Sequence, residues 1–162
     1  MKLNGSCSCG KVKFSLSSKH PYPYQRCYCT ICRKTGGGGG YAINISGEAK
    51  SLKVTGKKFV SVYQAMVKNP EDKKGERSHG ERNFCKMCGT SLWLYDSRWP
   101  ELIHPMASAI DTELPVAREH THLMTEFKPK WVKIERAAKD LVFKRYPKES
   151  IADWHKRHHV SG

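Results

Sequence analysis

Short runs in which apolar and polar residues alternate recur along the chain and predict β-strands. From residue 11 onward every second residue is apolar, and these residues are Val12, Phe14 and Leu16. This period of two places one set of side chains on a buried face and the other set on a solvent-facing side. Further runs, rich in β-branched and aromatic residues, cover residues 41–45, 52–54, 59–63 and 91–95. Such short, closely spaced runs predict a mainly β fold.

The second half of the chain continues this pattern and then changes in kind. Strands are predicted at residues 102–110 and 122–127, with residues 131–134 as the last strand. Residues 67–81 are almost wholly polar, which predicts an exposed loop. Near the C-terminus, Ile151 and Trp154 lie one helical turn apart, with acidic residues before them and basic residues after them. This order complements a helix dipole, so we expect a short surface helix whose Ile151 and Trp154 pack against the sheet.

Seven cysteines occupy three short clusters and divide into a set of four and a set of three. The set of four consists of two pairs far apart in the sequence, namely Cys7, Cys9, Cys85 and Cys88. The first pair lies in a turn that leads into a strand, and the second lies on a knuckle between two strands, as in zinc ribbons. The set of three, within six residues, consists of Cys27, Cys29 and Cys32.

A disulfide framework with one free thiol is the simplest alternative for seven cysteines. It fits poorly, because a chain of 162 residues is longer than the small secreted scaffolds that need disulfides. Cysteines one or two residues apart also reach disulfide geometry with difficulty. The spacings differ from the usual iron–sulfur runs, whereas C-x2-C is a recognised zinc pattern. The cysteines therefore favour zinc.

The two sets predict zinc sites of different chemistry. Four thiolates complete the tetrahedral coordination of zinc and make a closed site that contributes to folding. Three thiolates leave one position open for a substrate, so this site is suited to chemistry. Arg33 and Lys34 follow the set of three and either neutralise an anionic ligand there or are ordinary surface bases. The five glycines at 36–40 allow either a close approach to a ligand or a flexible loop.

The chain is strongly basic, with a formal net charge of +14. Such a charge attracts nucleic acids, acidic membranes and small carboxylated metabolites alike. The basic residues are interspersed with acidic ones, and no recognition-helix or aromatic RNA-binding motif is evident, which argues against nucleic acid. No apolar stretch reaches 18 residues and the N-terminus has no secretory signal, so we expect no membrane partner and a reducing compartment, most simply the cytoplasm. No histidine lies at ligand spacing from a cysteine pair.

Three cysteine-containing blocks together resemble a known family. Residues 5–12, 27–34 and 82–90 resemble the three signature blocks of the glutathione-dependent formaldehyde-activating enzymes, whose domain is shared with centromere protein V. The resemblance spans residues 1–135. It predicts a zinc-binding domain over this range and a C-terminal extension at 136–162, packed on the same domain.

This resemblance implies a fold, a cofactor and an activity. The implied fold is a β-tent of the Mss4-like type, with zinc-ribbon-like knuckles, a structural zinc on Cys7, Cys9, Cys85 and Cys88, and a catalytic zinc on Cys27, Cys29 and Cys32. Two zinc ions per chain are therefore expected. The implied activity is that of a carbon–sulfur lyase acting on a thiol–aldehyde adduct, such as the one that glutathione and formaldehyde form. The alternative is a non-catalytic zinc-binding module that binds nucleic acid, chromatin or a protein partner. The sequence leaves the oligomeric state open.

Overall fold

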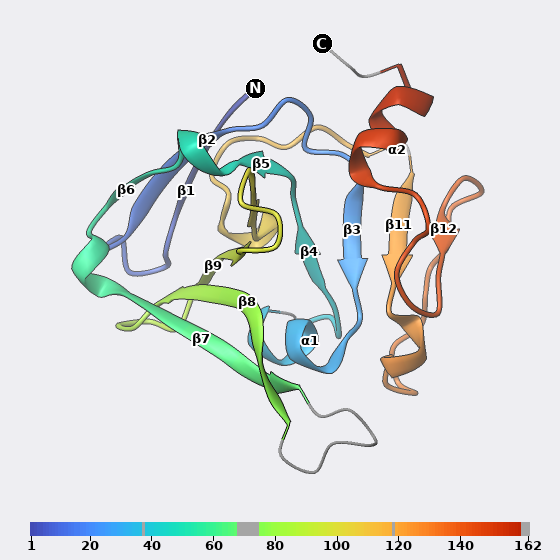
Figure 1. The fold of residues 1–162 in the computed structure, drawn as a ribbon, viewed down its shortest axis with the longest axis horizontal. Coiled ribbons are helices and arrows are strands. Elements are labelled where there is room, and N and C mark those ends of the chain that lie inside the picture. Colours follow the sequence, from blue (N-terminus) through green and yellow to red (C-terminus); the bar gives the residue numbers. More distant parts are fainter. Residues whose placement is uncertain (37, 68–74, 118, 160–162) are drawn as a thin grey trace.

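Strands dominate the computed structural model, which describes residues 1–36, 38–67, 75–117 and 119–159. Within these residues, twelve strands form three sheets (Figure 1). The first sheet is antiparallel and contains, in spatial order, β1 (Lys2–Ser6), β2 (Lys13–Ser17) and β6 (Lys53–Thr55). The second is antiparallel and contains β5 (Gly47–Glu48), β10 (Leu102–Pro105), β9 (Ser91–Asp96), β8 (Glu76–Cys85) and β7 (Val60–Val67).

The third sheet contains both parallel and antiparallel pairs, and it joins segments that are far apart in the sequence. Its order is β12 (Leu141–Val142), β11 (His120–Leu123), β3 (Tyr24–Cys27) and β4 (Ala42–Asn44), with β11 parallel to both β3 and β12. The two α-helices of the described residues are α1 (Thr30–Gly36) and α2 (Ile151–Arg157). Single turns of 3-10 helix are η1 (Ala49–Ser51), η2 (Lys57–Phe59), η3 (Ala107–Ala109) and η4 (Thr125–Phe127). The first and third sheets lie on opposite sides of the molecule (Figure 1).

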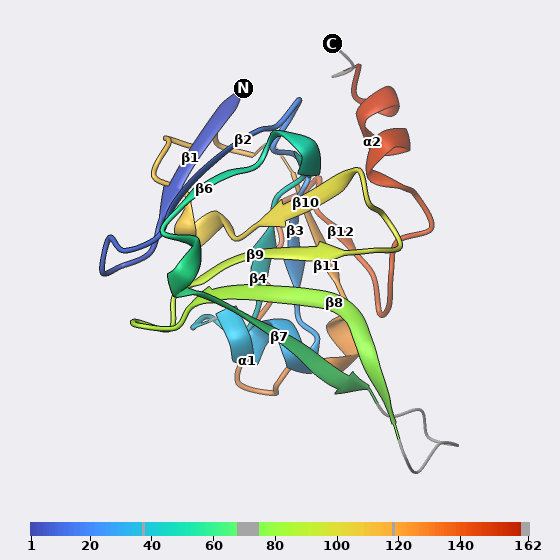
Figure 2. The same cartoon turned by 60° about the vertical axis from the view of Figure 1, so that its left-hand side comes forward.

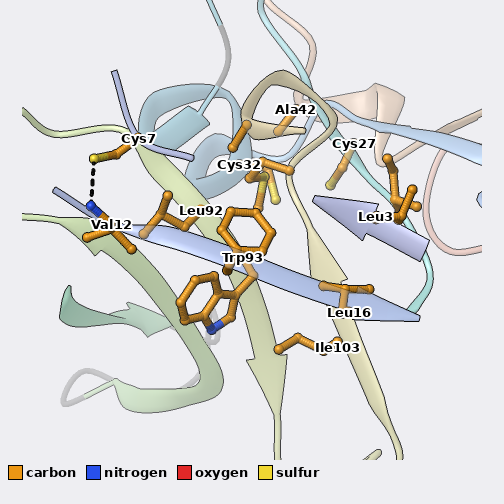
Figure 3. Close-up of a cluster of buried hydrophobic side chains, with 14 of the residues drawn as sticks. Leu3, Cys7, Val12, Leu16, Cys27, Cys32, Ala42, Leu92, Trp93 and Ile103 are labelled. Carbon is orange, nitrogen blue, oxygen red and sulfur yellow. Dashed lines mark hydrogen bonds between the residues drawn. The ribbon is translucent and has the colours of Figure 1, made fainter. Parts of the chain in front are cut away.

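The core forms where β2 packs against the five-stranded sheet. Val12, Phe14 and Leu16 are all buried, as their alternation predicts. The Phe14 ring meets the ring of Trp93 on β9 edge to face, with 5.2 Å between the centroids. Figure 3 shows this cluster together with several of the cysteine side chains. The mainly β fold predicted from the sequence is confirmed, and its apolar core includes members of both cysteine sets.

Several predicted elements differ from the structure. Residues 76–81, predicted as loop, form the first half of β8, because backbone pairing with β7 holds them although their side chains are polar. Figure 2 shows this pair of strands extending away from the body. Residues 68–74 of the predicted loop lie outside the described residues. Residues 131–134 form no strand; the Val132 N–H instead bonds the Pro129 carbonyl, and the buried Val132 side chain lies beside Gly40.

The predicted strands at 102–110 and 122–127 are also shorter than expected. The first ends at Pro105, and the small residues that follow form η3, since alanine and serine do not favour extended structure. The second ends at Leu123, where Met124 adopts a positive φ of 60° and η4 begins. Helix α1 and strands β1, β3, β5 and β12 were not predicted as such. Strands β5 and β12 have only two residues each, and α1 and β1 include residues of weak propensity for their structure, so none shows a clear period.

The predicted C-terminal helix is confirmed as α2. Ser150 caps it by accepting a hydrogen bond from the Asp153 N–H. Trp154 is buried and its Nε1 donates a 2.7 Å hydrogen bond to Glu119, while Ile151 is half-buried. In the described part of the chain, no helix combines the length and the apolar composition needed to cross a membrane.

Gly56, the residue after β6, packs closely against the backbone that follows the Cys9 turn. Its φ is +78°, and a Cβ there would lie 1.9 Å from the Lys11 carbonyl oxygen. Gly10 has a similar φ of +71° but open space around it, so Gly10→Ala should cost only backbone strain, about 1 to 2 kcal/mol. Gly56→Ala should lower the free energy of unfolding by about 1 to 3 kcal/mol more, because of the added clash. Urea denaturation followed by circular dichroism measures both, and equal losses would contradict the close approach.

Candidate metal centres

The fold brings the seven cysteines together in the two sets that the sequence predicts. Within each set, every Sγ atom lies within 4.8 Å of the others. The first set, the four-cysteine centre, contains Cys7, Cys9, Cys85 and Cys88. The second set, the three-cysteine centre, contains Cys27, Cys29 and Cys32. No histidine or carboxylate of the described residues joins either set. Each centre could hold a metal ion.

Two knuckles build the four-cysteine centre. One follows β1 and carries Cys7 and Cys9, whose Sγ atoms are 3.5 Å apart. The other joins β8 to β9 and carries Cys85 and Cys88, with 3.8 Å between the Sγ atoms of Cys9 and Cys85. The Val12 N–H donates to Cys7 Sγ at 3.2 Å, an interaction suited to a thiolate. The sequence prediction of one turn and one knuckle is confirmed.

Thr90 links the two knuckles of this centre. Its hydroxyl oxygen accepts a 3.1 Å hydrogen bond from the Ser8 N–H and lies 3.2 Å from Cys88 Sγ. This contact lowers the pKa of Cys88 to about 6. Gly89, between the two residues, has a φ of +75°, which suits the tight turn. The four-cysteine centre thus brings together segments more than seventy residues apart, which a metal ion held there could cross-link.

The three-cysteine centre forms where β3 ends and α1 begins. Cys27 ends β3, Cys32 lies on α1, and Cys29 precedes the helix. The Cys32 N–H donates to Cys29 Sγ at 3.3 Å, which turns the second thiol toward the third. Cys27 and Cys32 are buried, and Figure 3 shows both beside the apolar core. Cys29 is partly exposed, so this centre is open to solvent on one side.

Contacts among the thiols of the three-cysteine centre shift their pKa values. Hydrogen bonds from Cys27 and then Cys32 lower the pKa of Cys29 to about 2. Cys27 is the donor in that hydrogen bond, and its contacts with Cys29 and then Cys32 raise the pKa of Cys27. Three adjacent thiols, two of them buried, can therefore all lose their protons only with a cation among them. Soft thiolate donors of this kind suit zinc, so the residues present fit that metal.

A buried arginine that sequence reasoning missed lies beside the three-cysteine centre. Arg82 on β8 is only 7% exposed, and its Nη2 is 4.0 Å from Cys32 Sγ. Its Nη1 donates to the Gly80 carbonyl at 3.3 Å, which fixes the guanidinium. One signal in the sequence points to it, since Arg82 opens the block 82–90 that carries Cys85 and Cys88. Arg82 supplies positive charge where thiolates gather.

The other candidate residues near this centre have separate roles. Arg33 is half-buried on α1, and its Nε has no hydrogen-bond partner among the described residues, whereas Lys34 is exposed. In the glycine run, a Cβ on Gly40 would lie 2.3 Å from Val132 Cγ2. The close approach at Gly40 is therefore to another part of the chain. Gly37 lies outside the described residues.

Comparisons with known proteins agree with this geometry. The family model of the glutathione-dependent formaldehyde-activating enzyme matches residues 2–127, which include all seven cysteines. A curated relative from Halomonas elongata, 56% identical over 157 residues, covers 97% of this chain and 96% of its own length. Its name assigns it provisionally to the glutathione-dependent formaldehyde-activating enzymes. A crystal structure of a Rhodobacter sphaeroides protein, 23% identical, matches 71% of this chain and 92% of its own with a TM-score of 0.53, which shows a shared fold.

Replacing one cysteine in each centre should separate their roles. Cys88→Ser opens the cross-link between two distant knuckles, and zinc binding to such a closed site contributes about 10 to 16 kcal/mol in small zinc modules. That exceeds the net stability of about 5 to 15 kcal/mol of a typical domain, so this variant should fail to accumulate as folded protein. Cys29→Ser changes a partly exposed ligand within one local loop, and should stay folded with one zinc ion. Circular dichroism melting and zinc analysis test this, and equal unfolding of both variants would contradict the assignment.

Proposed function

Because this chain belongs to the family of glutathione-dependent formaldehyde-activating enzymes, we propose that it joins glutathione to formaldehyde, or cleaves their adduct, at the three-cysteine centre. The observation that carries this proposal is the convergence of three Sγ atoms beside a partly exposed face. The four-cysteine centre has a full set of ligands and is proposed to be structural. The division into a domain at 1–135 and an extension at 136–162, and the cytoplasmic location, remain predictions.

Zinc is the proposed metal in both centres, two ions per chain. Cys27, Cys29 and Cys32 would hold the ion of the reactive centre. A zinc ion bound there would supply Lewis acidity, which lowers the pKa of a thiol that occupies its fourth position. Cys7, Cys9, Cys85 and Cys88 would hold the other ion.

The protein's own residues prepare this centre for an anionic thiol. Arg82, fixed by the Gly80 carbonyl, offers its guanidinium beside Cys32 and favours negative charge on sulfur. Arg33 adds a half-buried guanidinium on the adjoining helix. The net charge of +14 raises the local concentration of glutathione, whose two carboxylates outweigh its one ammonium group.

The proposed reaction is an addition without redox change. The substrate thiol loses its proton, and its sulfur lone pair forms a C–S bond to the aldehyde carbon. The carbonyl π electrons move to oxygen, which takes up one proton to give the hydroxymethyl group. In the reverse direction the C–S bond breaks and sulfur leaves as a thiolate. Burial of two of the three cysteines limits the access of bulk water to the inner side of the centre.

A second candidate function, binding of nucleic acid, has one observation in its favour. On the solvent face of the three-stranded sheet, register places Lys2 opposite Ser17, Lys13 opposite Ser6 and Thr55, and Lys53 opposite Ser15. No acidic residue belongs to these three strands. If this face binds phosphates, retention on DNA should fall steeply with salt, and Lys13→Gln with Lys53→Gln should weaken it. Retention that these substitutions leave unchanged would exclude the face as a phosphate-binding surface.

Calorimetric titration with glutathione and with S-methylglutathione tests the proposed enzyme function. Glutathione should bind more tightly by at least about tenfold, because methylation removes the thiol that reaches the metal. Exchange of carbon-13 formaldehyde into the adduct, followed by nuclear magnetic resonance, should be faster with the protein than without it. Cys29→Ser is the control and should lose both effects. Equal binding of the two compounds would show that the sulfur does not reach the centre.

A further inference from the structure

The residue between two ligands of the three-cysteine centre is itself buried. Tyr28, flanked by Cys27 and Cys29, is only 1% exposed. Its ring packs near two other rings, with centroid distances of 5.2 Å to Tyr41 and 5.9 Å to His122. The Tyr28 N–H also donates to the Leu123 carbonyl at 3.1 Å. The middle of the ligand loop is therefore anchored through both its backbone and its side chain.

A chain of hydrogen bonds continues from Tyr28 into the C-terminal part of the molecule. The Tyr28 hydroxyl is 2.9 Å from His122 Nδ1, and His122 Nε2 is 3.1 Å from Asp140 Oδ2. His122 and Asp140 are 0% and 1% exposed, so bulk water does not compete for these bonds. None of the three residues belongs to the predicted ligand sets, and Asp140 lies beyond the region that the family model matches.

The carboxylate of Asp140 sets the direction of this chain. Burial alone would raise its pKa, but hydrogen bonds from the His120 N–H, His122 and the Ala137 N–H lower it. An ionised carboxylate only accepts hydrogen bonds, so His122 must donate from Nε2. Burial lowers the pKa of His122 and keeps its ring neutral, so Nδ1 carries the lone pair and accepts the hydrogen of the Tyr28 hydroxyl. The chain runs from Tyr28 through His122 to Asp140, with one proton in each bond.

Hydrogen bonds from two backbone N–H groups hold the Asp140 carboxylate in place at the end of this chain of hydrogen bonds. Its Oδ1 accepts from the His120 N–H at 2.8 Å and its Oδ2 from the Ala137 N–H at 3.1 Å. The side chains of His120 and His122 both face this carboxylate, at 3.3 Å and 3.1 Å. The carboxylate thereby ties β11 to the turn at 137–140, and β11 pairs in parallel with β3 up to the level of Cys27. The anchor and the ligand loop belong to adjoining strands.

We propose that Tyr28, His122 and Asp140 are positioning residues that hold Cys27 and Cys29 in the geometry of the three-cysteine centre. This inference rests on the proposed function only in requiring that the centre bind zinc. Two ligands one residue apart share the peptide units of Tyr28, so rotation of that residue would move both Sγ atoms. Reactive geometry tolerates errors of only about 0.5 Å, and groups behind the ligands commonly set it.

The rate at which zinc leaves each centre tests this proposal directly. Wild-type protein loaded with zinc is mixed with a coloured chelator, and release is followed as two phases; Cys29→Ser identifies the phase that belongs to the three-cysteine centre. Tyr28→Phe removes only the hydroxyl and keeps the ring packing. It should speed that phase by about 10- to 100-fold, the usual effect of losing a group behind a metal ligand, and should leave the four-cysteine phase within about twofold. Asp140→Asn should act in the same direction.

Controls separate positioning from general loss of stability. Glu135→Gln changes an exposed acid five residues before Asp140 and should alter neither phase. The double variant Tyr28→Phe with Asp140→Asn should release zinc no faster than the faster single variant, because both substitutions interrupt the same series of hydrogen bonds. Equal acceleration of both phases, or no acceleration, would overturn this inference while leaving the proposed function intact. Wild-type protein with zinc in the four-cysteine centre alone would overturn the proposed function and this inference with it.

Discussion

Seven thiol groups can gather inside a protein only if something neutralises the charge that they carry as thiolates. In this chain, two of the four-cysteine ligands and two of the three-cysteine ligands are buried in the apolar core. Thiols so placed share protons among themselves, as the opposite pKa shifts of Cys27 and Cys29 illustrate. A divalent cation in each centre would remove that conflict.

The two centres meet the same requirement with different architecture. The four-cysteine centre draws on two knuckles from distant parts of the chain, so its ligands and the fold depend on one another. The three-cysteine centre draws on one local loop, with Arg82 beside Cys32 and Tyr28 packed behind the ligands. A local loop can keep one side open while the rest of the structure holds its shape. In the proposed function, this open side is the place where a thiol meets an aldehyde.

The sequence predicted the features that local pattern determines. Alternation identified the buried face of β2, cysteine spacing identified both centres, and charge order identified α2. It missed features that depend on contacts between distant residues. Nothing in the sequence distinguishes Asp140 from other acidic residues, because only the fold places it beside His122, eighteen residues away. The glycine run did not reveal that Gly40 makes room for Val132. The polar first half of β8 is held by backbone pairing, which leaves no trace in hydrophobic pattern.

The central claim is that one zinc ion is fully coordinated by cysteine and the other keeps a position for substrate sulfur. X-ray absorption at the zinc edge measures this directly, because it counts the sulfur atoms around the metal. With four cysteines in one centre and three in the other, the account predicts an average of about 3.5 sulfur atoms per zinc. Saturating glutathione should raise that average to about four. An average that glutathione leaves unchanged, in protein with two zinc ions per chain, would contradict the account.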